Sequence, residues 1–342
     1  MSVTVSGQRL VGVAVAAAML AAGCSVGATP APTGPVAFHV QLTPSHVSVA
    51  IAADQGFYQR VKVSYTQVGY DVSSQLFQAG TDPIGNESPW ETAVYQDQGK
   101  DIRYFSTVDA SNALQGIIIR TEDAGKYKGL PDLKGQKVGI PGFGTGIWAA
   151  LQVVTKAFFN IDAKMDFQII EGNPGDLEGL LQTKSVEAMI TFAAPTAHAL
   201  ANTNYKMLYN LSEEWQKAKG AYLPANGWEA DAGFLDANLE AMKDFVAGTQ
   251  KGLEYLKAHP DINKRGAKYE NFALNEGVLT SPETTALVDK LIQDGLWYFS
   301  DSVYTQQWVD AVYEFIQAGD GILLPKGKIP PKEKVFYLPL LK

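Results

Sequence analysis

Strand-like and helix-like segments alternate along most of this chain, and this alternation constrains the fold more than any other feature. From Val36 to about Gly220, short β-branched or alternating segments are followed by segments with helical spacing. The strand-like segments cover residues 36–43, 60–68, 101–108, 113–121, 166–172 and 186–192. Because strands that alternate with helices form sheets covered by those helices, the pattern predicts an α/β protein.

The last third of the chain is mostly helical in pattern. In residues 281–295, SPETTALVDKLIQDG, Ser281 is a favourable cap, Pro282 suits the first turn and Gly295 ends the helix. The 342 residues, 46% of them hydrophobic, are enough for two domains with a sizeable core. The formal net charge of −8 argues against a protein that binds nucleic-acid backbones, which needs basic patches.

The first residues are typical of an export signal. Arg9 precedes an apolar run from Leu10 to Ala22, which is short for a membrane span and suits a secretory signal. The single cysteine, Cys24, follows, and the stretch resembles a bacterial lipoprotein signal. Residues 1–23 are therefore predicted to be the signal peptide, Cys24 the lipidated residue, and 24–35 a flexible tether. An ordinary cleaved signal with an incidental cysteine is the alternative.

A glycine-rich segment, PGFGTGIW at 141–148, looks at first like a phosphate-binding loop. It fits neither the G-x-G-x-x-G pattern of dinucleotide-binding proteins nor the G-K-[ST] ending of a P-loop. A strand-like segment precedes it and a helical one follows. Its glycines therefore expose backbone N–H groups at a helix N-terminus, which can hold an oxyanion or a carbonyl oxygen.

Four segments, in this order, resemble the solute-binding proteins of bacterial ABC importers. The nearest branch binds nitrate, alkylsulfonates and thiamine-precursor pyrimidines. The segments are AIAADQGFY (50–58), LFQAGTDPIG (76–85), DLKGQKVGIPGFGTG (132–146) and VEAMITFAAP (186–195). The resemblance extends from about residue 38 to residue 330.

This resemblance implies a bilobed periplasmic-binding-protein fold, with two α/β lobes joined by a two-segment hinge. The crossings would lie near 117–122 and 219–226. Lobe one would then hold residues 36–118 and 223–342, and lobe two residues 119–222. The ligand of such proteins lies between the lobes, held by loops at the carboxyl ends of strands.

Loops at those strand ends supply the candidate ligand-binding residues. They lie in QLTPSH (41–46), GNESPW (85–90), GFGTGIW (142–148), TFAAP (191–195) and ANGWEAD (225–231). The candidates are Thr43, Ser45, His46, Asn86, Glu87, Ser88, Trp90, Phe143, Gly144, Thr145, Trp148, Thr191, Phe192 and Trp228. Several have structural alternatives: the tryptophans can belong to the core, His46 can cap its helix, and Glu87 can pair with a cation or cap the following helix.

The charges of these loops bear on the ligand. The first four contain no Lys or Arg, and Glu87 would repel an anion if it faced the cleft. The amide of Asn86 and the carboxylate of Glu87, beside aromatic rings, suit a neutral ring with N–H donors and C=O acceptors. The prediction is therefore a heteroaromatic vitamin or precursor, such as riboflavin or a thiamine-type pyrimidine. An alkylsulfonate, taurine or nitrate is the alternative.

An enzyme is the competing class. The four histidines, at 39, 46, 198 and 259, are widely spread, and no H-E-x-x-H or G-x-S-x-G motif occurs. Pyrimidine-synthesising relatives on this fold rely on a cysteine-rich motif that the chain lacks. A lipoprotein that only scaffolds other envelope proteins is a third possibility.

The function expected from the sequence is solute capture, without catalysis, cofactor or metal. The protein would be exported, lipid-anchored to the outer face of the cell membrane, and monomeric. Its lobes would close around one small molecule and dock on a membrane permease driven by a separate ATPase.

Overall fold

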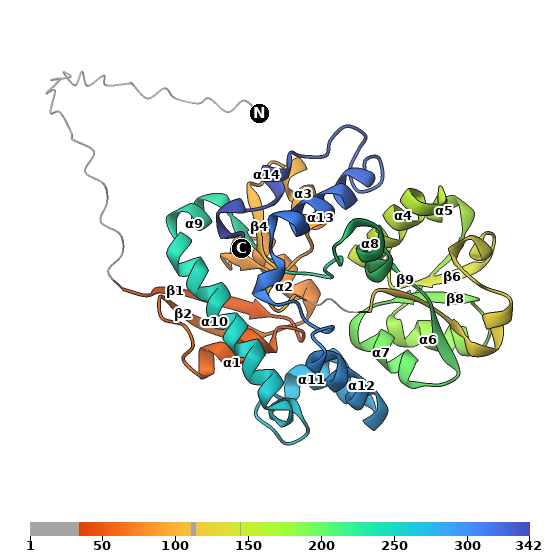
Figure 1. The fold of residues 1–342 in the computed structure, drawn as a ribbon, viewed down its shortest axis with the longest axis horizontal. Helices are drawn as coiled ribbons and strands as arrows, with labels where there is room; N and C mark the ends of the chain where they lie inside the picture. The colour runs from red at the N-terminus through yellow and green to blue at the C-terminus, as the bar shows by residue number, and fades with distance from the viewer. Residues whose placement is uncertain (1–33, 111–113, 144) are drawn as a thin grey trace, which may run out of the picture. The chain divides into compact units, whose positions relative to one another are not determined.

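The computed structural model describes residues 34–110, 114–143 and 145–342. The predicted signal peptide, Cys24, most of the tether and Gly144 therefore lie outside the described residues. Residues Gly34–Lys342 form one unit built from two groups of elements, which we call lobe one and lobe two (Figure 1).

Lobe one is built from the first and last parts of this unit. Its first part contains β1 (Val36–Leu42), α1 (Val47–Asp54), β2 (Val61–Gln67), α2 (Tyr70–Gln78), β3 (Ile84–Gly85), α3 (Pro89–Asp97) and β4 (Ile102–Ser106). Its last part contains β10 (Trp228–Asp231), α9 (Ala232–Ala237), α10 (Leu239–Ala258), η3 (Pro260–Asn263), α11 (Glu270–Glu276), η4 (Val278–Thr280), α12 (Pro282–Gln293), η5 (Asp301–Val303), α13 (Gln306–Ala318), α14 (Lys332–Val335) and η6 (Leu338–Leu340).

Lobe two is continuous in sequence. It contains β5 (Gly116–Arg120), η1 (Thr121–Gly125), η2 (Leu130–Leu133), β6 (Lys137–Ile140), α4 (Gly146–Phe159), α5 (Ala163–Asp166), β7 (Gln168–Glu171), α6 (Pro174–Gln182), β8 (Ala188–Thr191), α7 (Ala193–Ala201), β9 (Tyr205–Asn210) and α8 (Leu211–Lys219).

The strands of the two lobes pair separately. In lobe one, β1 runs parallel to β2 with Val36 opposite Val61, and β10 pairs antiparallel with both β3 and β4. Lobe two has a five-stranded sheet in the order β7-β6-β8-β5-β9. Within it, β6 is parallel to β7 and β8, whereas β5 is antiparallel to β8 and β9. The lobe-two sheet is therefore mixed, whereas lobe one has one parallel and one antiparallel sheet, and helices pack around the sheets (Figure 1).

The chain passes between the lobes twice: β4 of lobe one ends at Ser106 and β5 of lobe two begins at Gly116, and α8 of lobe two ends at Lys219 and β10 of lobe one begins at Trp228. The first crossing ends before the 117–122 expected from the sequence, because Ile117–Ile119 are fully buried in β5 and paired with β8 and β9. A run of β-branched residues suits such a central strand better than a hinge. The two crossing segments touch, since the Gln115 amide donates to the Leu223 carbonyl at 2.9 Å.

Close helix packing completes the unit. A Cβ added to Gly252 of α10 would lie 2.1 Å from the Ser48 carbonyl oxygen of α1, so only glycine permits this approach. Between the lobes, the Trp215 ring of α8 lies 5.3 Å from the Phe315 ring of α13. Its indole N–H donates to the Ala311 carbonyl at 3.1 Å. An aromatic anchor therefore joins a helix of lobe two to a helix of lobe one.

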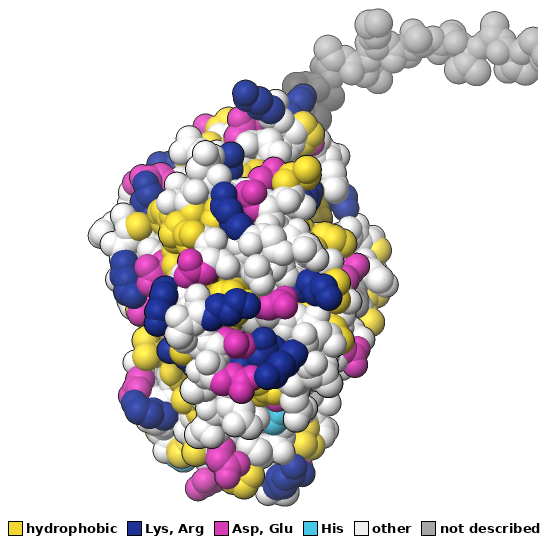
Figure 2. Space-filling model, turned by 90° about the vertical axis from the view of Figure 1, so that its right-hand side faces the viewer, with side chains coloured by type: hydrophobic (Ala, Val, Ile, Leu, Met, Phe, Trp, Pro, Cys, Tyr) yellow, Lys and Arg dark blue, Asp and Glu magenta, His cyan; other side chains and the backbone are white. Residues whose placement is uncertain are grey.

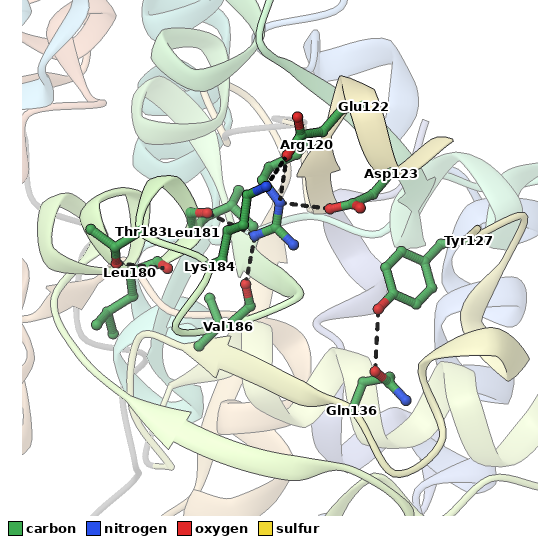
Figure 3. Close-up of polar contacts among 10 residues, drawn as sticks. All are labelled: Arg120, Glu122, Asp123, Tyr127, Gln136, Leu180, Leu181, Thr183, Lys184 and Val186. Carbon is green, nitrogen blue, oxygen red and sulfur yellow. Dashed lines mark hydrogen bonds and ion pairs between the residues drawn. The ribbon is translucent and has the colours of Figure 1, made fainter. Parts of the chain in front are cut away.

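Arg120, at the end of β5, holds part of lobe two together (Figure 3). Its guanidinium donates to the carbonyls of Leu181 and Val186, at 2.7 and 2.8 Å, and pairs with Asp123 at 2.6 Å. The side chain thereby fastens the connection between α6 and β8 to the central strand. The guanidinium is committed to these contacts.

Candidate ligand-binding site

A cavity of about 690 Å³ lies between α2 and α3 of lobe one and the start of α4 in lobe two. This volume is in the range of small-molecule sites. The cavity brings together five of the residues predicted from the sequence: Glu87, Trp90, Phe143, Thr145 and Trp148.

The lobe-one wall of the cavity carries two adjacent carboxyl groups. Glu87 lies just before α3, and its two oxygens accept hydrogen bonds from the hydroxyls of Tyr70 and Tyr95, at 2.9 and 3.0 Å. Glu91 lies one turn along α3. It accepts from the Ser88 backbone N–H at 2.8 Å, from the Ser88 hydroxyl at 2.6 Å and from the Tyr70 hydroxyl at 3.3 Å. Ser88 and Glu91 thus form a capping box, and the alternative role of Glu87 as a helix cap does not apply.

A third carboxyl group, Glu229 of β10, lies near these two and is fully buried. One of its oxygens accepts from the Thr92 hydroxyl at 2.7 Å, and the other has no partner among the described residues. Burial, and then the charge of Glu87, raises the pKa of Glu229 well above its usual range and that of Glu91 to about 8. Among the described residues, no Lys, Arg or His forms an ion pair with any of the three.

Aromatic rings form much of the remaining wall. Trp90 is only 2% exposed, and its indole N–H has no partner among the described residues. Phe143 is 53% exposed and lies edge-on to Trp148, with ring centroids 5.6 Å apart. A Cβ added to Gly146 would lie 3.2 Å from the Trp90 indole nitrogen. The absence of a side chain at this position therefore lets the start of α4 approach Trp90 closely.

The glycine-rich loop is partly satisfied by the chain itself. The Thr145 hydroxyl donates to the Gly142 carbonyl at 2.7 Å and accepts from the Trp148 N–H at 3.4 Å, which caps α4. The Phe143 N–H donates to the carboxylate of Glu171 at 3.1 Å. An acidic side chain therefore already uses one of the loop amides that the sequence offered to an oxyanion.

Three other predicted residues form a buried cluster away from the cavity wall. The Thr43 hydroxyl lies 2.7 Å from Nδ1 of His46, and Asn226 Nδ2 lies 3.3 Å from its Nε2. The His46 ring packs on that of Trp228, which is fully buried and donates to the Val108 carbonyl at 2.7 Å. Burial lowers the pKa of His46 to about 3. In this structure Thr43, His46 and Trp228 therefore belong to the packed interior.

The remaining predicted residues also lie off the cavity wall. The Asn86 amide donates to the Ser73 hydroxyl at 2.9 Å, and Ser88 caps α3. Thr191 is buried, and its hydroxyl has no partner among the described residues. The residues off the wall, besides the buried cluster, are Ser45, Asn86, Ser88, Thr191 and Phe192.

The structure adds residues to the site that the candidate set lacks. Glu91 and Tyr95 follow Glu87 at four-residue spacing, which places them on one face of α3. This four-residue spacing is visible in the sequence and could have identified Glu91 and Tyr95 as neighbours of Glu87. Tyr70 comes from α2, and nothing in the local sequence indicated its contact with Glu87.

Charge elsewhere on the molecule is mixed. Figure 2 shows a face on which Lys and Arg side chains are interspersed with Asp and Glu. Lys164, on α5, is the basic residue that lines the cavity, and it is exposed. Within the described ranges, no helix is long and apolar enough to cross a membrane, and no group of three or more His, Cys, Asp or Glu is placed to hold a metal ion.

A separate buried carboxyl makes stability depend on pH. Glu276, at the end of α11, accepts from the Tyr298 hydroxyl at 3.3 Å, and burial raises its pKa to about 8. Between about pH 5 and that value the folded state holds this proton, whereas the unfolded state has lost it. Stability therefore falls as pH rises toward about 8 and levels off above it. His46 is neutral in both states above about pH 7 and adds no slope there.

We expect Glu276→Gln to flatten this dependence. In the parent protein, ionisation of Glu276 should cost about 2 kcal/mol of stability between about pH 6.5 and pH 9. Melting temperatures measured across that interval should fall less in the variant than in the parent. Glu283→Gln, at an exposed position in α12, is the matched control. Parallel curves for Glu276→Gln and the parent would contradict the prediction.

The comparisons with known proteins agree with this architecture. Residues 43–262 match the protein family described as NMT1/THI5 like. No curated protein matches the chain.

Solved structures with a similar fold include three bacterial proteins. The periplasmic aliphatic sulphonate binding protein SsuA from Escherichia coli has a TM-score of 0.66 at 13% identity, over 90% of this chain and 94% of that one. A protein from Bordetella bronchiseptica has a TM-score of 0.63 at 18% identity, over 88% and 94%. The alkanesulfonate-binding protein SsuA from Xanthomonas axonopodis pv. citri, bound to MOPS, has a TM-score of 0.58 at 14% identity, over 86% and 96%.

At these identities the likeness concerns the fold. It confirms the α/β class and the periplasmic-binding-protein fold predicted from the sequence. The family match covers well over half of the residues. The chain therefore belongs to the NMT1/THI5-like family.

Proposed function

We propose that the protein is the extracytoplasmic solute-binding component of an ABC importer. It captures a small heteroaromatic vitamin or vitamin precursor, such as riboflavin or a thiamine-type pyrimidine, between its lobes and delivers it to a membrane permease driven by a separate ATPase. The observation that carries the proposal is the cavity between the lobes, in which Glu87 and Glu91 face aromatic residues.

The chemistry of this wall favours a ring over an anion. The carboxyl groups of Glu87 and Glu91 accept hydrogen bonds from N–H donors, and the charge of Glu87 repels sulfonate or nitrate. Phe143, 53% exposed, offers a ring face to a ligand, and an aromatic pair adds about 0.5–1.5 kcal/mol beyond the burial of its area. Trp90 and Trp148 are almost fully buried and support this wall from within. Arg120 of lobe two is committed to its own structural contacts and is not offered to an anion.

Sulfonate or nitrate binding is the second candidate. Helix α7 begins after the predicted loop at 191–195 and has no side-chain cap, so its N-terminal amides can hold an oxyanion. The N-terminus of α1 is already used within the chain, because Asp109 accepts from the Ser48 hydroxyl at 2.6 Å and from the backbone of Ser48 and Val49. Two of the solved structures named above are sulfonate-binding proteins. Their similarity to this chain supports the second candidate as much as the family match supports the first.

A thermal-shift panel on the protein produced without its first 24 residues tests the proposal. The panel contains riboflavin, an aminomethyl pyrimidine, thiamine, taurine, a longer alkylsulfonate and nitrate. A ligand at about 100 times its dissociation constant stabilises the folded state by about 2.7 kcal/mol. A shift with a ring compound alone supports the proposal. A shift with sulfonate or nitrate alone transfers the function to the second candidate.

Membrane attachment gives a separate prediction. We propose that Cys24 carries a lipid and anchors the exported protein to the outer face of the cell membrane. Cys24→Ala should then move the protein from the membrane fraction to the soluble extracytoplasmic fraction, as measured by immunoblotting of both fractions. Retention of the variant in membranes would reject the lipid anchor and would leave the binding function untouched.

A further inference from the structure

The proposed function does not account for the cluster of carboxyl groups at the site. Three carboxyl groups, Glu87, Glu91 and Glu229, lie together without an ion-pair partner among the described residues. Two of them line the cavity. We propose that the ligand is a nitrogen base that is cationic at neutral pH, and that its charged N–H group binds Glu87 and Glu91. This inference rests on the proposed function and specifies its ligand class.

The hydrogen bonds of Glu87 leave room for such a group. Each oxygen accepts one tyrosine hydroxyl, from Tyr95 or Tyr70, and a carboxylate oxygen has two acceptor positions. Glu87 is only 4% exposed, so bulk water does little to complete its shell. A buried carboxylate is costly without an opposite charge, and a cationic N–H donor supplies both the charge and the missing hydrogen bonds.

The opposite wall suits the same ligand. Aromatic faces attract cations, and the half-exposed ring of Phe143 lines the cavity on the lobe-two side. Lys164, the basic residue on the wall, forms no ion pair with the three glutamates and is exposed, so it does not neutralise them.

A second, independent observation defines another part of the ligand. Trp90 lines the cavity, and its indole N–H is buried without an acceptor among the described residues. An unsatisfied buried donor costs about 1–3 kcal/mol, so the bound molecule should supply an acceptor there. A ring nitrogen or carbonyl oxygen on the same molecule would do so. The ligand class is thus a heteroaromatic ring with an acceptor atom and a cationic amine or amidinium group.

Calorimetric titration with a matched series tests the inference. Three probes share a 4-amino-2-methylpyrimidine ring and differ at position 5: aminomethyl is cationic, hydroxymethyl is neutral and carboxylate is anionic. Cyclohexylmethylamine is the cation without an aromatic ring. At about pH 7.5 we expect the aminomethyl compound to bind at least about ten-fold more tightly than the hydroxymethyl compound, with no binding of the carboxylate.

The outcomes separate the two proposals. Equal binding of the cationic and neutral rings, or tighter binding of riboflavin, overturns the cationic ligand and leaves the heteroaromatic function standing. Equal binding of the aminomethyl pyrimidine and cyclohexylmethylamine would support a cationic ligand and would overturn the requirement for a heteroaromatic ring. Failure of every cation at about 1 mM overturns the inference. Binding of sulfonate alone overturns both proposals.

A variant of Glu91 provides a control on the protein side. Gln at this helix position still completes a capping box, so Glu91→Gln should fold. We expect the preference for the aminomethyl over the hydroxymethyl ring to fall about ten-fold in this variant. Glu283→Gln, at an exposed site, should keep the parent preference. An unchanged preference in Glu91→Gln would count against a role for this carboxyl group.

Discussion

Glu87→Gln is expected to weaken binding of the ring ligand by about 10- to 100-fold. Glu87 lines the cavity and is held by two tyrosine hydroxyls, so its position is fixed before the ligand arrives. The substitution keeps the shape of the side chain and removes its charge. The loss should therefore appear as a higher dissociation constant in calorimetric titration, with little change in the melting temperature of the free protein.

The same variant separates the two candidate ligand classes. A sulfonate or nitrate should bind Glu87→Gln as well as it binds the parent, or more tightly, because a repelling charge is gone. Tyr95→Phe, which removes one hydroxyl donor to Glu87 and keeps all charges, should have a smaller effect than Glu87→Gln. Glu283→Gln is the exposed control. Unchanged affinity of Glu87→Gln for the ring ligand would remove Glu87 from the site.

The fold could be predicted from local signals. The alternation of segments indicated the α/β class because each strand and helix carries its own pattern of burial. The helix predicted at 281–295 is α12, where the Ser281 hydroxyl accepts from the Thr284 N–H at 3.1 Å and Pro282 is in the first turn. The residues expected at the first crossing, 117–122, overlap β5 (Gly116–Arg120). Only pairing with β8 and β9 identifies residues 117–120 as a central strand.

The site was predicted less completely, because burial at a loop depends on tertiary packing. His46 lies in the loop after β1 and Trp228 begins β10, yet both side chains pack inward. A Cβ on Gly227 would lie 1.9 Å from the Tyr104 hydroxyl, so the glycine brings this segment down onto the core. The contact of Glu171 with the Phe143 N–H is also tertiary, and it occupies an amide that the sequence left free.

The last prediction concerns the structural role of Arg120 in lobe two. Arg120 donates to two carbonyl groups and pairs with Asp123, and its side chain is only 10% exposed. Arg120→Met keeps the apolar stem and leaves both carbonyls and the carboxylate without their donor. The free energy of unfolding should fall by about 3 kcal/mol, measured by urea titration.

Two comparisons show whether this arginine is structural. Lys184→Met, which removes only an exposed pair with Glu122 at 2.8 Å, should leave the urea midpoint almost unchanged. Arg120→Met should also keep the parent's dissociation constants for ring compounds and sulfonates below its unfolding transition, because the guanidinium serves the connection between α6 and β8. A selective loss of sulfonate binding would instead place Arg120 in an anion site. Equal urea midpoints for Arg120→Met and Lys184→Met would show that its contacts contribute little to lobe two.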